Sequence, residues 1–300
     1  MAVTPVGNPY VESSDLVANY PGASEALAER IDIVGVNPFA NAAARDAAIP
    51  SPVQGQMCSL NDDNKGYRYD GSAWVLFSGA GPANFTNTAT GTYTDGGISY
   101  KYITFTGTGS LTIDVAGLAD VLLVAGGGSS RVGSSDTYRG GGGAGGMIYS
   151  ASKYLAVGTH TVTVGAGGVI DSGGNSNFLD LYAIGGGNGQ SGAATVKGVD
   201  GGSGSGASGG GRAPGSGVIG QGNDGGYSAS AEAGGGGAGG AGSGSMAGVG
   251  LSNSITGSAV TYATGGADGT TSAANSGNGG NGDSAGVNGD SGVFIIRVAV

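Results

Sequence analysis

Glycine dominates the C-terminal part of this chain, where it accounts for 56 of the 175 residues from 126 to 300. Each glycine loses more conformational entropy on folding than any other residue. A chain with this glycine density either stays disordered or packs its backbone segments more closely than a Cβ atom would allow. The glycines do not recur at every third position, which excludes a collagen triple helix.

Short runs of strand-forming residues separate the glycine runs, and disordered segments contain few such residues. These runs are Val162–Val164, Ala183–Ile184, Val260–Tyr262 and Val293–Ile296. We therefore expect an ordered β structure with inserted glycine-rich polyproline II helices. Such helices have three residues per turn and no internal hydrogen bonds, so their N–H and C=O groups would bond between neighbouring helices. A disordered, linker-like chain is the alternative.

The residues just before the glycine-rich part also predict strands. Residues 100–105 and 110–115 alternate with a period of two, which is typical of strands with two different faces. Residues 120–125 form a continuous apolar run, which predicts a strand buried on both faces. The expected fold class is mainly β, with residues 80–300 as one glycine-rich β domain.

The N-terminal residues 1–36 have a different character. Residues 23–31 are rich in helix formers, and Leu27 and Ile31 lie four apart on one face of the predicted helix. A helix this short is unstable alone and must dock on a partner or on copies of itself. We expect a short helical anchor here, with the candidate attachment residues Leu16, Val17, Tyr20, Leu27 and Ile31.

A proline-containing linker is predicted for residues 37–52, and a small β module for residues 53–79. The predicted strands of this module are Val53–Leu60, Tyr67–Tyr69 and Ala73–Phe77, with a hairpin turn signal at Asp70-Gly71. A module of this size is too small to fold by itself. We therefore expect it to act as a collar that holds several copies of the chain together.

The charge of the chain limits its partners. It carries 11 Lys and Arg against 21 Asp and Glu, a net charge of −10, which argues against nucleic acid or an anionic membrane. The single cysteine, Cys58, excludes an intrachain disulfide framework and a zinc site of clustered cysteines, and we expect it to be a small buried apolar residue. The absence of a long apolar run and of a secretory pattern predicts cytoplasmic synthesis without membrane insertion.

The sequence gives little support to catalysis. Residues 121–128 look like a strand entering a nucleotide-binding glycine loop, but no helical pattern follows to hold a phosphate. His160, the single histidine, is predicted to pack on a strand beside Val162 and Val164, so no Ser–His or Cys–His nucleophile can be assembled. Paired carboxylates leave a glycosidase as a weaker alternative. We expect no catalytic residue, no cofactor and no metal.

A few large side chains interrupt the glycine-rich loops. Aromatic and arginine residues in such positions are candidate recognition anchors, because they dominate the energy of many interfaces. The alternative is that they cap the ends of the scaffold or pack on a neighbouring chain. The candidate receptor-binding residues are Tyr138, Arg139, Arg212 and Tyr227.

Two parts of the sequence resemble known families. Ala43 to Gly55, followed by Tyr67 to Trp74, resembles a segment of bacteriophage fibre and tail proteins. Four further stretches resemble the glycine-rich domain of phage tail-fibre and adhesin proteins, namely residues 102–124, 141–149, 158–168 and 292–298. The order of strands and glycine runs is also similar, more distantly, to the glycine-rich domain of anaplastic lymphoma kinase receptors, a β-sandwich with inserted polyglycine helices.

These resemblances imply a short homotrimeric fibre or spike on the virion, with a jelly-roll-like β-sandwich at its tip. The N-terminus would bind other virion proteins, and residues 80–300 would bind a host cell-surface glycan or protein without catalysis. A structural head fibre or capsid decoration protein that has no receptor is the alternative, and a polysaccharide depolymerase is a weaker one. The resemblance transfers no binding residues to this chain.

Overall fold

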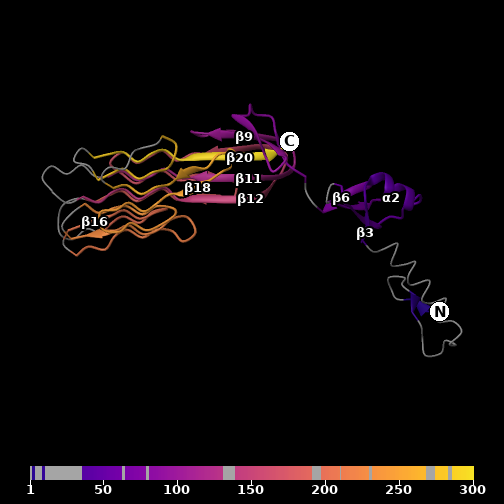
Figure 1. Cartoon of the computed structure of the whole chain (residues 1–300), viewed down its shortest axis with the longest axis horizontal. Helices are drawn as coiled ribbons and strands as arrows, with labels where there is room; N and C mark the ends of the chain where they lie inside the picture. Colours follow the sequence, from indigo (N-terminus) through magenta and orange to yellow (C-terminus); the bar gives the residue numbers. More distant parts are fainter. Residues whose placement is uncertain are drawn as a thin grey trace. The chain divides into compact units, whose positions relative to one another are not determined.

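The computed structural model describes most of the chain as two compact units, Met1–Gly81 and Pro82–Val300 (Figure 1). The described residues are 36–62, 65–78, 81–130, 139–190, 197–209, 211–229, 232–267, 274–282 and 286–300, with the backbones of β1 (Ala2–Val3) and β2 (Pro9–Tyr10). The five candidate virion-attachment residues and Tyr138 lie outside the described residues.

The first unit contains a four-stranded sheet in the order β3-β4-β5-β6. The strands are β3 (Val36–Phe39), β4 (Met57–Leu60), β5 (Lys65–Tyr69) and β6 (Trp74–Ser78). β3 runs parallel to β4, and the other pairs are antiparallel. The Asp70 carboxylate accepts hydrogen bonds from the backbone N–H groups of Ala73 and Ser72, both at 2.8 Å, which forms the predicted hairpin turn and lowers the pKa of Asp70.

Residues 37–52 differ from the predicted linker, because they hold most of β3 and the helix α2 (Ala42–Ala48). Pro38 fits here because β3 is an edge strand, where a missing N–H group is tolerated. Asn41 caps the helix by accepting a hydrogen bond from the Ala44 N–H at 2.9 Å. Arg45 of this helix is buried, with its guanidinium 4.9 Å from the centre of the Trp74 ring.

Cys58 is fully buried on β4, as the sequence predicted. Burial raises the pKa of its thiol, although the nearby Arg45 opposes this effect. A buried thiol with a raised pKa is unreactive, because the thiolate is the nucleophile. Cys58 therefore acts as a small apolar residue of the first unit.

The second unit is built on two five-stranded sheets, so the chain is mainly β. One sheet has the order β15-β14-β13-β10-β7 and the other β12-β11-β20-β9-β8, with antiparallel pairing throughout. The strands of the first sheet are β7 (Asn84–Phe85), β10 (Gly109–Val115), β13 (Gly158–Thr163), β14 (Ser176–Phe178) and β15 (Leu181–Ala183). Those of the second are β8 (Gly91–Asp95), β9 (Ile98–Phe105), β11 (Gly117–Val124), β12 (Met147–Leu155) and β20 (Val293–Ala299).

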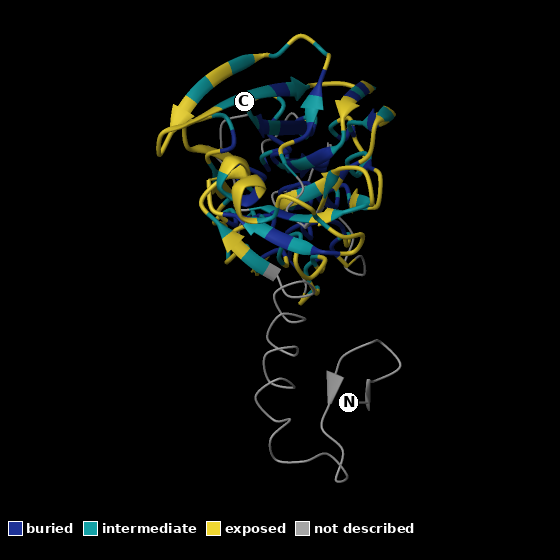
Figure 2. Ribbon diagram, turned by 90° about the vertical axis from the view of Figure 1, so that its right-hand side faces the viewer, coloured by how far each residue is buried: buried dark blue, intermediate teal, exposed yellow. Residues whose placement is uncertain are grey.

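Both sheets contribute to one apolar core. Phe85, Ile113 and Phe178 of the first sheet pack with Val121 and Phe294 of the second. The rings of Phe178 and Phe294 lie 4.6 Å apart between centroids, which joins the two sheets directly. Figure 2 colours buried residues dark blue, and some of them lie on strands.

Strand β11 is buried on both faces, which confirms the prediction from its continuous apolar run. Val121 and Leu123 face the core between the sheets. Leu122 and Val124 face a second core on the outer side, which includes Tyr262. This outer side is covered by the hairpin of β18 (Leu251–Asn253) and β19 (Val260–Tyr262).

His160 lies on β13, and its imidazole packs edge-on against Phe178 at 6.2 Å between centroids. Its Nε2 is 2.9 Å from the Ala156 carbonyl oxygen. This position agrees with the predicted packing of His160 on a strand.

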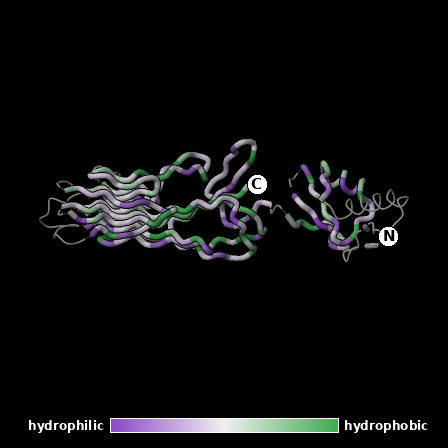
Figure 3. Tube along the Cα trace, turned by 90° about the horizontal axis from the view of Figure 1, so that it is seen from below, coloured by the Kyte–Doolittle hydropathy of each residue, from purple (hydrophilic) through white to green (hydrophobic). Residues whose placement is uncertain are grey.

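Glycine-rich segments extend from the ends of the strands and lie side by side, a region we call the glycine lattice (Figures 1 and 3). Residues 140–146 show its hydrogen-bond pattern. Their successive N–H groups donate in turn to residues 184–190, 233–236 and 277–280, at 2.7–3.0 Å, and the sequence of acceptors then repeats. The direction of hydrogen bonding therefore repeats every three residues.

The carbonyl groups of residues 140–146 bond to further backbone segments. They accept hydrogen bonds from residues 125–128, from residues 203–206 and from Gly266. Six backbone segments thus surround this central one, three as acceptors and three as donors. The backbone polar groups are satisfied by each other, as buried N–H and C=O groups must be.

This spacing leaves no room for side chains at many positions. An ideal Cβ placed on Gly126, Gly142 or Gly145 would lie 2.0 Å from a backbone carbonyl oxygen of a neighbouring segment. The φ angles of these three glycines lie outside the left-handed region, so close approach is what requires glycine here. The glycine runs are ordered, as predicted, because their bare backbones pack directly against one another.

We predict that Gly142→Ala disrupts the lattice, because its methyl group would overlap the Gly128 carbonyl. Overpacking a dense interior costs about 1–3 kcal/mol, and an overlap with backbone belongs at or above the upper end. The expected fall in melting temperature is at least about 6 °C, measured by thermal unfolding. Gly107→Ala is the matched control, since its Cβ would meet nothing within 4 Å. Equal melting temperatures for the two variants would contradict the lattice.

Candidate recognition site

The candidate recognition residues are found where lattice segments end. Two short parallel strands meet there, β16 (Ala207–Ser208) and β17 (Tyr227–Ser228). The Arg139 carbonyl accepts a hydrogen bond from the Ser208 hydroxyl and another from the Ala233 N–H at 2.9 Å. Arg139, β16 and β17 therefore lie on adjoining segments.

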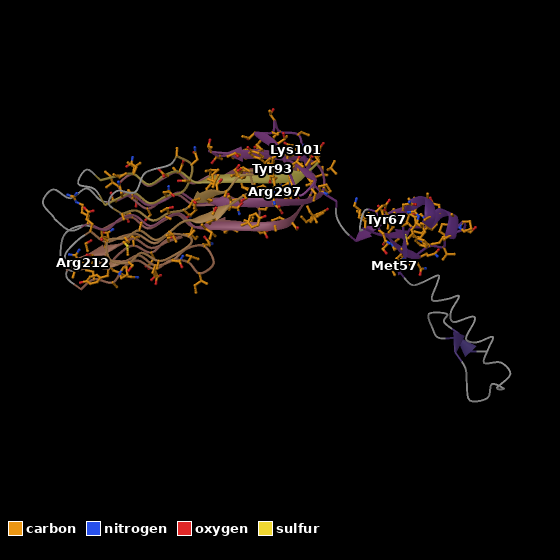
Figure 4. All side chains as sticks on the ribbon, in the orientation of Figure 1. Met57, Tyr67, Tyr93, Lys101, Arg212 and Arg297 are labelled. Atoms are coloured by element: carbon orange, nitrogen blue, oxygen red, sulfur yellow. The ribbon has the colours of Figure 1, made fainter. Side chains whose placement is uncertain are left out.

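Tyr227 is held at this corner by its own hydroxyl group. Its Oη accepts a hydrogen bond from the Gly211 N–H at 3.0 Å, and 39% of the residue remains exposed. Arg212 follows Gly211 directly and lies at the end of the lattice away from the five-stranded sheets (Figure 4). Tyr227 and Arg212 are thus brought together, although 15 positions separate them in the sequence.

Arg139 differs from these two residues because it is only 9% exposed. Arg212 is half-buried. The burial of Arg139 favours the alternative in which this side chain caps the scaffold. We call Tyr227, Arg212 and the neighbouring Gly211 the distal corner.

A hollow of about 380 Å³ lies elsewhere on the second unit, and sequence reasoning did not identify it. It opens between β9, β20 and the β18–β19 hairpin. Hydroxyl and aromatic side chains predominate in its wall, and none of the described residues that line it is charged. The residues around it are Thr90, Tyr102, Thr104, Thr106, Thr256, Val260, Thr261, Tyr262, Ala274, Asn275, Ser276, Val293 and Ile295.

A charged cluster fixes the hairpin beside this hollow. Arg297 Nε donates to Asp120 Oδ2 at 2.8 Å, and its guanidinium lies 4.7 Å from the centre of the Tyr100 ring. The same guanidinium donates to the Tyr93 hydroxyl, which donates in turn to the Ile255 carbonyl at 3.1 Å. Burial opposes the positive charge, but hydrogen bonds to Tyr93 and Asp120 outweigh it and raise the pKa of Arg297.

The described residues contain no group of three or more His, Cys, Asp or Glu side chains placed to hold a metal ion. In the same parts of the chain, no helix is both long and apolar enough to cross a bilayer.

The second unit matches the model of a known protein family. The model of a glycine-rich domain matches residues 103–299, which include the lattice and most strands of the two sheets but not β7, β8 or the first part of β9. The chain belongs to this glycine-rich domain family. A search of curated proteins found no match.

Tyr262 gives a testable consequence of burial near the hollow. It is only 5% exposed, and burial raises the pKa of its phenol, with the neighbouring Tyr102 adding to the effect. The folded protein therefore keeps this proton more firmly than the unfolded chain does. The resulting stability is complete below the ordinary tyrosine pKa of about 10 and is lost as the pH rises through the folded value.

We predict that the free energy of unfolding falls less steeply above about pH 10 in Tyr262→Phe than in the parent protein. Denaturant titrations across this pH range measure the difference. Tyr154→Phe is the control, because Tyr154 is 59% exposed on β12 and should follow the parent protein. Parallel curves for Tyr262→Phe and the parent would argue against the role of buried Tyr262.

Proposed function

We propose that this protein is a non-catalytic subunit of a phage virion fibre or spike, and that its glycine-rich domain binds a host cell-surface glycan or protein. The distal corner carries the proposal: Tyr227 is exposed there and anchored to Gly211. Sequence resemblance to phage fibre and adhesin proteins supports the virion assignment. Membership of the glycine-rich domain family supports the glycine-rich domain itself and does not bear on the virion assignment.

In this proposal the two five-stranded sheets are the layers of a jelly-roll-like β-sandwich. The glycine segments are polyproline II helices inserted between its strands. Two observations favour this description: the sheets share one core, and the direction of hydrogen bonding repeats every three residues, as expected for three residues per turn.

Rigidity makes such a scaffold suitable for recognition. Binding costs free energy when loops and side chains must be ordered, so positions fixed in advance favour affinity. The backbone around Tyr227 is fixed by β16–β17 pairing, and its hydroxyl by the bond to Gly211. An aromatic ring and a neighbouring arginine are the residue types that most often dominate interfaces.

Residues 53–79 of the first unit would form the collar of a homotrimer. Residues 1–36 would attach it to other virion proteins, through Leu16, Val17, Tyr20, Leu27 and Ile31. Support comes from the small size of the sheet in this unit and from its outer strands, β3 and β6, each of which pairs on one side only within the described part of the chain. The subunit would be made in the bacterial cytoplasm and displayed on the virion.

We predict that Tyr227→Ala and Arg212→Ala each weaken binding of the full-length protein to bacterial cells by about tenfold, roughly 1.4 kcal/mol. Cell binding across a panel of strains, with a glycan array, measures this. Tyr154→Ala is the control, because Tyr154 is exposed on β12, outside the distal corner.

Other outcomes would replace the proposal. Binding to no strain and no glycan would favour a structural head fibre or capsid decoration protein. Release of capsular sugar on incubation would favour a depolymerase. Full binding by both corner variants would move the receptor site away from the distal corner.

A further inference from the structure

Three side chains at the other end of the second unit form a chain of hydrogen bonds. Lys101 Nζ donates to Asn84 Oδ1 at 2.6 Å. Asn84 Nδ2 donates to Asp114 Oδ1 at 2.7 Å. An amine, a carboxamide and a carboxylate are thus in contact in that order, and neither the proposed recognition role nor the fold requires all three.

Lys101 occupies an unusual position for a lysine. Ile103 and Phe105, on the same face of β9, pack in or against the core between the two sheets, so alternation directs Lys101 to this inner side as well. Its ammonium group lies 4.4 Å from the centre of the Phe85 ring and donates to the Phe85 carbonyl at 3.0 Å. Figure 4 places Lys101 at the end of the unit opposite Arg212.

The contact crosses from one sheet to the other. Asn84 lies on β7, at the edge of the first sheet, and Lys101 lies on β9 in the second. The Phe85 side chain beside them is 1% exposed, so apolar surface bounds the site on one side. The two reactive groups are held together by strands that the shared core fixes in place.

This arrangement suits attack of an amine on an amide. Lysine amines act as nucleophiles in proteins when they lose their proton. Asn84 Cγ, the electrophilic carbon, is bonded directly to the oxygen that Lys101 Nζ contacts. Well-oriented intramolecular groups behave as if present at about 10⁵–10⁸ M, which can make an otherwise slow acyl transfer accessible.

We propose that Lys101 and Asn84 form an intramolecular amide cross-link, with Asp114 as the catalytic residue. Nζ loses one proton to solvent and attacks Cγ, forming the Nζ–Cγ bond. The Asp114 carboxylate, which accepts the hydrogen bond from Nδ2, takes up the second proton that Nζ loses, by way of solvent, and passes it to Nδ2 as the Cγ–Nδ2 bond breaks. The ammonia that leaves then takes up the first proton from solvent. In sum, a lysine ammonium and a carboxamide become a secondary amide and one ammonium ion, with no oxidant, reductant or cofactor.

The cross-link would reinforce a short edge strand of the unit. β7 has only two residues and pairs only with β10 among the described residues. It is also the first strand after the boundary between the two units at Gly81. A covalent bond from Asn84 to β9 would transmit a pulling force on this boundary into the second sheet.

The test is the intact mass of the full-length protein after purification and incubation at neutral pH. We expect a mass lower than the sequence mass by one ammonia molecule, and a fragment-ion spectrum in which peptides containing Asn84 and Lys101 are joined. A mass equal to that of the sequence, after allowance for removal of Met1, would overturn the proposal and leave an ordinary hydrogen bond.

Three variants test the roles of Lys101 and Asp114 in this reaction. Lys101→Arg keeps the positive charge but should abolish the mass loss completely. Asp114→Asn should slow the reaction about 100-fold or more, which is typical of removing a general acid. Lys153→Arg is the matched control, because Lys153 is paired with Asp180 on the surface at 2.5 Å and should leave the mass loss unchanged. Mass loss at the parent rate in Asp114→Asn would overturn the role of Asp114.

Discussion

The hydrogen bond between one bare backbone segment and the next is the interaction on which the second unit depends. At positions such as Gly126 and Gly142, a carbonyl oxygen of the neighbouring segment occupies the place that a Cβ would otherwise take. Such a lattice buries little apolar side-chain surface, so the hydrophobic effect cannot by itself set the alignment of its segments. The two sheets provide that alignment, because strands such as β11, β12 and β20 continue directly into lattice segments. Apolar burial at one end and backbone bonding at the other therefore stabilise a single structure.

Different residue types form the sheets and the lattice. Valine, isoleucine and phenylalanine hold the sheets, as in the pair Phe178 and Phe294. Glycine builds the lattice. Tyrosine and arginine also occur where segments end or beside the β18–β19 hairpin, as at Tyr227 and Arg297. Side chains at such places can thus change without altering the backbone packing that supports them.

Much of the fold could be predicted from local patterns. The period-two alternation located β9 and β10 within two residues, and the continuous run at 120–125 identified a strand buried on both faces. β12 was missed because its polar residues hide the alternation, and α2 because its alanines lie between prolines. Neither the burial of Arg139 nor the contact of Lys101 with Asn84 could be predicted, because both depend on pairing between segments distant in the sequence.

The hydrogen bonding of backbone groups within the lattice also affects how readily proteases can cut it. A protease binds its substrate as an extended strand and needs free backbone donors and acceptors, and it cuts most readily at exposed loop tips. In residues 140–146 every N–H group is already bonded to another segment. Furthermore, the sequence between Arg212 and Arg297 contains no lysine or arginine, so a protease that cuts after basic residues finds no site there. A glycine-rich composition is usually typical of an easily digested linker. In this fold the same composition forms a surface with few peptide bonds that a protease can cut.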